Sequence, residues 1–226
     1  MASTVFRAVR AASMVALLFG TLTGASLQEA TAQPTASQSG ALWLQTATVV
    51  TPIERGPTRA FLDTLVNVVE RKDGIRVLRS PDAEKRMDIS SLRSALISEE
   101  GIGVTSANHA FIDYRFSIDN GSRFRQTIQS IHFVFRPGPQ QTDVSVLYLD
   151  AQQPWVKEVI HRNGTSLRSN QAAVIPFHRH LGFAHIARQE KSEVVEVGGE
   201  TIRSRFDERK EDLIQKVQRL TYETFV

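Results

Sequence analysis

Histidines near the end of the chain are the first candidates for chemistry. His178 and His180 flank Arg179 within a β-type stretch from Ala172 to Ala187. Residues two apart on a strand project from the same face, so both imidazoles are expected to point the same way. Paired neutral imidazoles are a geometry that binds zinc, copper or iron. The spacing therefore predicts half of a metal site.

A metal site on this strand needs a third ligand. His161, expected on a neighbouring strand, is the first candidate. His185 has the opposite parity unless the strand bulges at Gly182, and His132 is a further alternative. The competing interpretation is a solvent-facing side of an edge strand. If these histidines bind a metal ion, we expect the protein to be a small metal-dependent enzyme.

Other catalytic arrangements find little support in the residues. No G-x-S-x-G motif is present, and Ser90, Ser91 and Ser94 fall in an expected helix. Asp113 and Glu158 are possible members of a carboxylate pair, although solvated faces explain both. This lack of a specific motif favours a non-catalytic protein, and we expect no cofactor.

Composition excludes several classes of site. The chain has no cysteine, which removes disulfides, thiolate nucleophiles, zinc–cysteine sites, iron–sulfur clusters and cysteine-linked lipid anchors. Its net charge is +3, and Lys and Arg form no long run. We therefore expect no nucleic-acid partner.

The first residues have the three parts of a secretory signal. Arg7 and Arg10 precede the apolar run 14–19, and Ala30-Thr31-Ala32 is a small-residue cleavage site. We predict that residues 1–32 are a cleavable signal peptide and that the protein is periplasmic or secreted. A mitochondrial transit peptide is the rival interpretation, but the apolar residues are consecutive rather than spread round a helix.

The remaining chain is expected to be one domain. Residues 33–40 are small and polar and predict a flexible leader, followed by a single domain over residues 41–226. No apolar run approaches the roughly 20 residues that a membrane-spanning helix needs. We therefore expect no membrane span.

Periodicity predicts the order of the elements. Period-two alternation and turn residues favour strands, including a pair joined by Asn120-Gly121, whereas 3.6-residue spacing favours helices. The expected strands cover 41–50, 75–78, 109–118, 124–136, 143–150, 155–161, 172–187, 194–197 and 200–203. The expected helices cover 58–72, a segment from Ser80-Pro81 to Gly101, and a C-terminal segment capped by Asp207.

This order predicts an α+β fold, in which an antiparallel meander of about six to seven strands packs against a long C-terminal helix. Two further helices lie near the N-terminus. Consecutive strands joined by short turns are antiparallel neighbours, and the amphipathic last helix must bury its apolar stripe. The order resembles that of the helix-grip architecture.

The apolar sheet face supplies the binding hypothesis. Its expected ligand contacts are Tyr114, Phe116, Phe133, Phe135 and Phe177. A concave, mostly apolar face of this kind is typical of a site for a lipid-like small molecule. The alternatives are a packed core without a cavity, an envelope module that binds another envelope protein, and the metal-dependent enzyme. Arg residues interleaved with aromatics at 114–116 and 123–125 are a further alternative, for a glycan or an anionic lipid head group.

Overall fold

The computed structural model describes residues 43–119, 123–138, 141–167, 170–202 and 208–223. The predicted signal peptide, the leader, the Asn120-Gly121 turn and the Asp207 cap lie outside these residues. Within them, no helix combines the length and the apolar character needed to cross a membrane.

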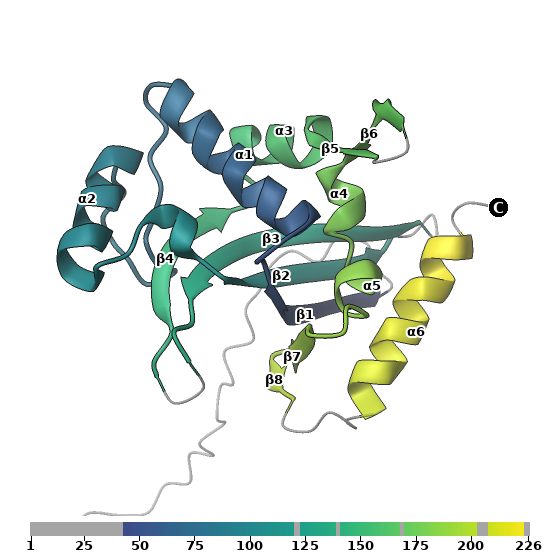
Figure 1. The fold of residues 1–226 in the computed structure, drawn as a ribbon. Helices are drawn as coiled ribbons and strands as arrows, with labels where there is room; N and C mark the ends of the chain where they lie inside the picture. Colours follow the sequence, from purple (N-terminus) through teal and green to yellow (C-terminus); the bar gives the residue numbers. More distant parts are fainter. Residues whose placement is uncertain (1–42, 120–122, 139–140, 168–169, 203–207, 224–226) are drawn as a thin grey trace, which may run out of the picture. The chain divides into compact units, whose positions relative to one another are not determined.

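A six-stranded antiparallel sheet forms the centre of the fold, with strand order β4-β3-β2-β1-β7-β8 (Figure 1). Its strands are β1 (Trp43–Pro52), β2 (His109–Ile118), β3 (Phe124–Phe135), β4 (Val144–Asp150), β7 (Glu193–Val197) and β8 (Glu200–Thr201). A separate hairpin pairs β5 (Gly164–Leu167) with β6 (Asn170–Pro176). The predicted α+β fold with an antiparallel sheet is confirmed.

Alternation along the central strands gives the sheet two unlike faces. On one face Val49 lies opposite Ile112, which lies opposite Ile131, and all three are buried. One position further along, Thr48 lies opposite Asp113 and therefore faces the other side. The apolar face is the one that the helices cover.

The helices are α1 (Pro57–Arg71), α2 (Ile89–Glu100), α3 (Pro154–Arg162), α4 (Phe177–His180), α5 (Phe183–Ile186) and α6 (Glu208–Glu223), with a short 3₁₀ turn η1 (Val104–Ser106). Figure 1 shows α1 crossing the sheet. Phe61 of α1 contacts Phe133 of β3 and Phe177 of α4, with ring centroids 6.3 and 5.2 Å apart. These contacts place α1 and α4 over the middle of the apolar face.

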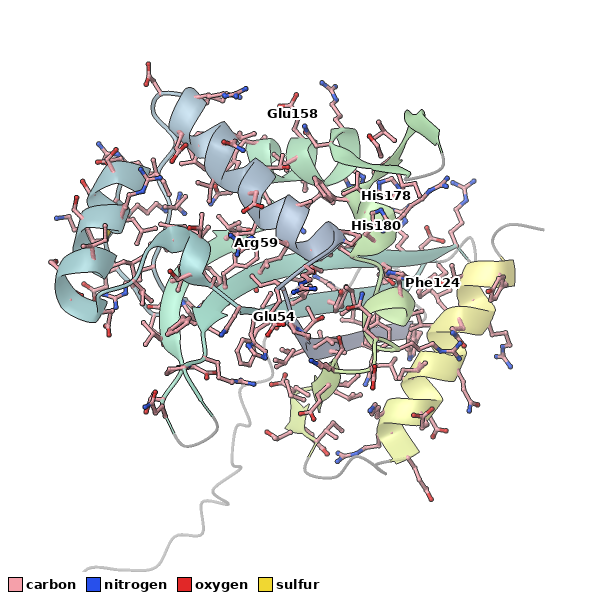
Figure 2. The ribbon with its side chains drawn as sticks, in the orientation of Figure 1. Glu54, Arg59, Phe124, Glu158, His178 and His180 are labelled. Carbon is pink, nitrogen blue, oxygen red and sulfur yellow. The ribbon has the colours of Figure 1, made fainter. Side chains whose placement is uncertain are left out.

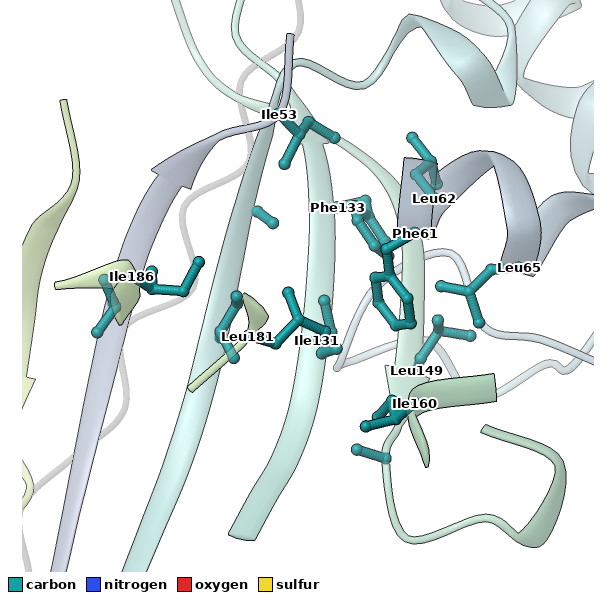
Figure 3. Close-up of a cluster of buried hydrophobic side chains, with 14 of the residues drawn as sticks. Ile53, Phe61, Leu62, Leu65, Ile131, Phe133, Leu149, Ile160, Leu181 and Ile186 are labelled. Carbon is teal, nitrogen blue, oxygen red and sulfur yellow. The ribbon is translucent and has the colours of Figure 1, made fainter. Parts of the chain in front are cut away.

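The core lies between this sheet face and the helices (Figure 3). It is built from fully buried aliphatic and aromatic side chains, among them Ile53, Leu62, Leu65, Ile131, Leu149, Ile160, Leu181 and Ile186. Burial of large apolar side chains of this kind is the main favourable contribution to folding, at about 1.5–3 kcal/mol each.

The C-terminal helix covers only one end of the sheet. Helix α6 buries Leu213, Ile214 and Val217 and packs against α5 and β7. The ammonium of Lys216 lies 4.1 Å from the ring centroid of Trp43, at the start of β1. The amphipathic stripe is therefore buried as expected, but α1, α4 and α5 cover the middle of the sheet.

Two segments expected to be strands are helical instead. Trp155–His161 belongs to α3, where Val156, Val159 and Ile160 follow a helical spacing that turns all three into the core. The stretch 172–187 is strand only as far as Pro176 and then forms α4 and α5. Each of these helices has four residues, too few for periodicity to reveal.

The second helix begins later than Ser80-Pro81. Its N-cap is Asp88, whose carboxylate accepts hydrogen bonds from the backbone N–H of Ser91 at 2.8 Å and from the Ser91 hydroxyl at 2.9 Å. These bonds satisfy an amide that has no partner within the helix, and they lower the pKa of Asp88. The preceding segment contributes isolated bridges at Val77 and Leu78 rather than a strand.

Candidate functional site

The aromatic residues expected to contact a ligand belong mostly to the core. Tyr114, Phe116, Phe133 and Phe177 are at most 1% exposed and pack against other rings, while Phe135 is half-buried. These side chains fill the space between sheet and helices. They are not among the residues that line the pockets described below.

The histidines meet in pairs on the helices. His161 lies in the last turn of α3 and His178 lies in α4, with ring centroids 5.1 Å apart. His180 instead contacts the hydroxyl of Thr165 through Nε2 at 2.9 Å, and its ring lies 6.1 Å from that of His185. Because α4 is a helix and not a strand, His178 and His180 point in different directions.

This pairing does not bring three ligands together. Within the described ranges, no group of three or more His, Asp or Glu side chains is placed to hold a metal ion. His161 and His178 form one pair, and His180 belongs to another. The strand geometry from which the His-x-His hypothesis started is therefore wrong.

An apolar pocket of about 770 Å³ opens between the start of β3, helices α4 and α5, and the end of α6. Figure 2 shows Phe124 on the sheet and His178 on α4, at this side of the molecule. The lining residues are Phe124, Gln126, His178, Arg179, Gly182, Ala184, His185 and Thr221. The surface of the pocket is mostly apolar, and its polar side chains are Gln126, His178, Arg179, His185 and Thr221.

A smaller and more polar pocket of about 270 Å³ lies beside β3, α3 and α4. Its lining residues are Gln126, Thr127, Ile128, Ala151, Gln152, Lys157, Ile160, His161 and His178. Gln126 and His178 line both pockets, so the two hollows adjoin on either side of this pair. The polar pocket has nitrogen-bearing side chains from three elements.

Two observations describe how Gln126 and His178 are held. The Gln126 carbonyl accepts a hydrogen bond of 3.3 Å from the backbone N–H of Phe183, which leaves the amide nitrogen of Gln126 available as a donor. Burial, with the nearby His161 and Arg179 as smaller causes, lowers the pKa of His178. The lowered pKa favours the neutral form of His178 at pH 7.

Sequence reasoning missed most of the pocket residues. Gln126 had a usable signal, because it shares strand parity with Phe124 and Ile128 and so places a polar group on the apolar face. Lys157 was missed because 155–161 was expected to be a strand, although Val156, Val159 and Ile160 have a helical spacing. The polar pocket joins β3, α3 and α4, which are separated in the chain.

A second polar cluster lies on the opposite sheet face. Asp113 accepts a hydrogen bond of 2.7 Å from Thr48 and another from the hydroxyl of Ser130. Glu158, its expected partner in a carboxylate pair, lies on α3 and forms an ion pair with Arg162 at 3.1 Å. The two acids are thus on separate elements and do not form a pair.

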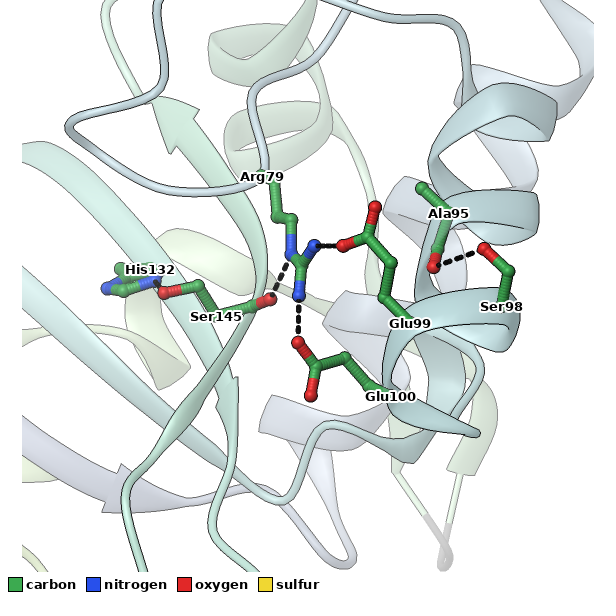
Figure 4. Close-up of polar contacts among 7 residues, drawn as sticks. All are labelled: Arg79, Ala95, Ser98, Glu99, Glu100, His132 and Ser145. Carbon is green, nitrogen blue, oxygen red and sulfur yellow. Dashed lines mark hydrogen bonds and ion pairs between the residues drawn. The ribbon is translucent and has the colours of Figure 1, made fainter. Parts of the chain in front are cut away.

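The same face contains a serine–histidine contact near the sheet edge (Figure 4). His132 Nε2 lies 3.1 Å from Ser145 Oγ, and burial lowers the pKa of His132. Arg79 donates from Nε to the Ser145 carbonyl at 3.1 Å and binds the carboxylates of Glu99 and Glu100. Among the described residues no carboxylate bonds to the His132 ring, so the pair lacks the orienting acid of a catalytic triad.

Comparison with protein-family models, with curated proteins and with solved structures found no match for this chain.

Proposed function

We propose that this protein is an exported, non-catalytic binding protein for a lipid-like, amphipathic small molecule. The observation that carries the proposal is the apolar pocket between β3, α4, α5 and α6. Ligand pockets are typically concave and mostly apolar, with a few polar groups that orient the ligand, and span roughly 300–1,000 Å³. At about 770 Å³ this pocket falls within that range.

The lining chemistry supports an amphipathic ligand. Phe124, Gly182 and Ala184 offer apolar surface, whereas Arg179 and His185 supply polar groups at the same pocket. A ligand with an alkyl or ring portion and one polar end satisfies both kinds of surface, because apolar burial and polar contact then occur together.

The first experiment is native mass spectrometry of residues 33–226, purified from cells without detergent. We expect a bound mass of a few hundred daltons that is lost on gentle organic extraction. The extracted protein is then titrated with 1-anilinonaphthalene-8-sulfonate, and 1-decanol is added as a competitor. Loss of the fluorescence gain on adding 1-decanol indicates a shared apolar site.

Filling the pocket provides the matched test. Ala184→Trp places an indole into the pocket and is expected to weaken 1-decanol binding by about tenfold or more, with the native circular dichroism spectrum retained. Ser94→Trp adds the same side chain to the exposed side of α2 and serves as the control. Equal binding by both variants contradicts the proposed site.

Export is tested separately. Cell fractionation of the full chain, with mass spectrometry of its N-terminus, should find a mature form beginning at Gln33. An uncleaved protein confined to the cytoplasm contradicts this part of the proposal.

A further inference from the structure

Two adjoining hollows with unlike chemistry meet at the side chains of Gln126 and His178. The larger hollow is mostly apolar, and the smaller one is lined by Lys157, His161 and His178 together with two glutamine amides. An amphipathic molecule has the same division into an apolar portion and a polar end. The structure therefore raises the question of which polar end the smaller hollow fits.

Charge answers this question. No Asp or Glu is among the described residues that line the smaller hollow. Lys157 is exposed and has no ion pair within the described part of the chain. Glu158, which follows it, pairs with Arg162 instead. A cationic group without a countercharge favours an anion.

Hydrogen-bonding capacity points the same way. Lys157 offers an ammonium, and the amide nitrogen of Gln126 is not occupied by the Phe183 contact, in which the carbonyl takes part. His161 and His178 add ring nitrogens. Donors that converge from β3, α3 and α4 suit the several acceptor oxygens of an oxyanion.

We infer that the smaller hollow is a head-group subsite for a singly or doubly charged oxyanion, such as a carboxylate, sulfonate or phosphate, whose attached apolar chain lies in the larger pocket. This inference rests on the proposed function and specifies its ligand class. Lys157 supplies the fixed positive charge, and His178, at the boundary of the two hollows, contacts the head group.

Anion binding at the head-group subsite should become tighter as the pH falls. His178 faces His161 and Lys157 of α3, Arg179 lies beside it on α4, and His185 of α5 lines the same apolar pocket. All of these groups are neutral or positive. Burial and the neighbouring His161 and Arg179 lower the pKa of His178 in the free protein, and a bound anion raises it again because it supplies a countercharge.

Four probe ligands separate the contribution of the head group to binding from that of the alkyl chain. Decanesulfonate has one negative charge from pH 5 to 8. 1-Decanol and decyltrimethylammonium have the same alkyl chain with a neutral and a cationic head group, respectively. Methanesulfonate provides the head group without the alkyl chain. Each is titrated by isothermal calorimetry, the two charged decyl compounds below their micellar concentrations and 1-decanol below its solubility limit. We expect decanesulfonate to bind about tenfold more tightly than 1-decanol at pH 7, and more tightly again at pH 5.5.

Substitutions test which residues cause the preference for decanesulfonate over 1-decanol. Lys157→Gln should remove most of the difference between decanesulfonate and 1-decanol. Lys85→Gln removes an equal charge from an exposed site that lines neither hollow and should leave the difference unchanged. His178→Gln should abolish the gain in decanesulfonate affinity between pH 7 and pH 5.5, whereas Lys85→Gln should keep that gain.

The outcomes distinguish this inference from the proposed function. Equal binding of decanesulfonate and 1-decanol overturns the head-group subsite but leaves the apolar site intact. No binding by either overturns the proposed function and with it the inference. Methanesulfonate binding as tightly as decanesulfonate overturns the link between the hollows and indicates a site for small free anions.

Discussion

The hydroxyl of Tyr114, on strand β2, donates a hydrogen bond of 2.8 Å to the backbone carbonyl of Leu181, between helices α4 and α5. Both residues are about 1% exposed, and burial strongly raises the pKa of the phenol, which therefore stays protonated and able to donate. The ring also packs edge-on against Phe183, at a centroid distance of 5.4 Å. One side chain thus fixes the short helices that form the pocket wall.

Removing that hydroxyl should destabilise the protein. Tyr114→Phe keeps the ring but leaves the buried Leu181 carbonyl without this partner, which costs about 1–3 kcal/mol in free energy of unfolding. Urea denaturation followed by circular dichroism measures the change. Tyr148→Phe, at a half-buried position on the opposite face, is the control and should change stability by less than about 0.5 kcal/mol. Equal effects would show that the Leu181 bond contributes nothing.

Phe177 should act as a core residue rather than as a ligand contact. It is completely buried, and its ring lies 5.2 Å from that of Phe61. Phe177→Ala is expected to lower the free energy of unfolding by about 3–5 kcal/mol, because it removes buried surface and leaves a cavity. Val174→Ala, at a side chain that is 56% exposed, should have an effect below about 0.5 kcal/mol. A stable Phe177→Ala variant that loses only ligand binding contradicts this assignment.

Gly164 should tolerate no side chain. A Cβ at this position would lie 2.0 Å from the Ile175 carbonyl oxygen and 2.8 Å from the Pro176 Cα, both of them backbone atoms of the paired strand. Gly164→Ala must therefore displace β6, at a cost of roughly 1–3 kcal/mol, and should raise the rate of proteolysis in the β5–β6 hairpin. Gly138→Ala, where nothing lies within 4 Å, is the matched control. Identical proteolysis of the two variants would contradict the close approach.

Stability should decrease under mildly acidic conditions. Burial lowers the pKa of His109, His132, His178 and His180 below the ordinary value of 6.5. A histidine with a lowered pKa in the folded state contributes stability that is fully present above pH 6.5. This stability is lost as the pH falls from 6.5 through the lower folded-state pKa, because the unfolded chain binds the proton more readily in that range. Urea midpoints measured from pH 8 to pH 5 should therefore decrease below about pH 6.5.

His132 allows this pH dependence to be assigned. His132→Gln removes the titrating ring and retains a polar group beside Ser145, so the loss of stability between pH 7 and pH 5 should become smaller. Ser145→Ala removes the hydroxyl contact but leaves the buried imidazole, so its pH dependence should persist. If the His132→Gln variant loses as much stability between pH 7 and pH 5 as the parent protein, His132 does not contribute to the pH dependence.

The strand pattern and the two faces of the sheet were predictable from the sequence. Period-two alternation from His109 to Phe135 places Ile112, Tyr114 and Phe116 on one face, and the register between β2 and β3 agrees with that assignment. The long amphipathic helices α1 and α6 were also found, because several turns of consistent spacing leave only one buried face. Gly198 and Gly199 both have positive φ and form the turn between β7 and β8.

The candidate site depended on the tertiary structure. Helices α4 and α5 have one turn each, so no periodicity distinguishes them from strands, and α3 was read as a strand despite its helical spacing. Whether an aromatic ring fills the core or lines a pocket depends on what packs against it from elsewhere in the chain. Residue type and local spacing determined strands β1 to β4, the long helices α1 and α6 and the apolar face, since these follow from interactions between near neighbours. Only the packing of distant segments decided that Gln126, Lys157 and His178 meet.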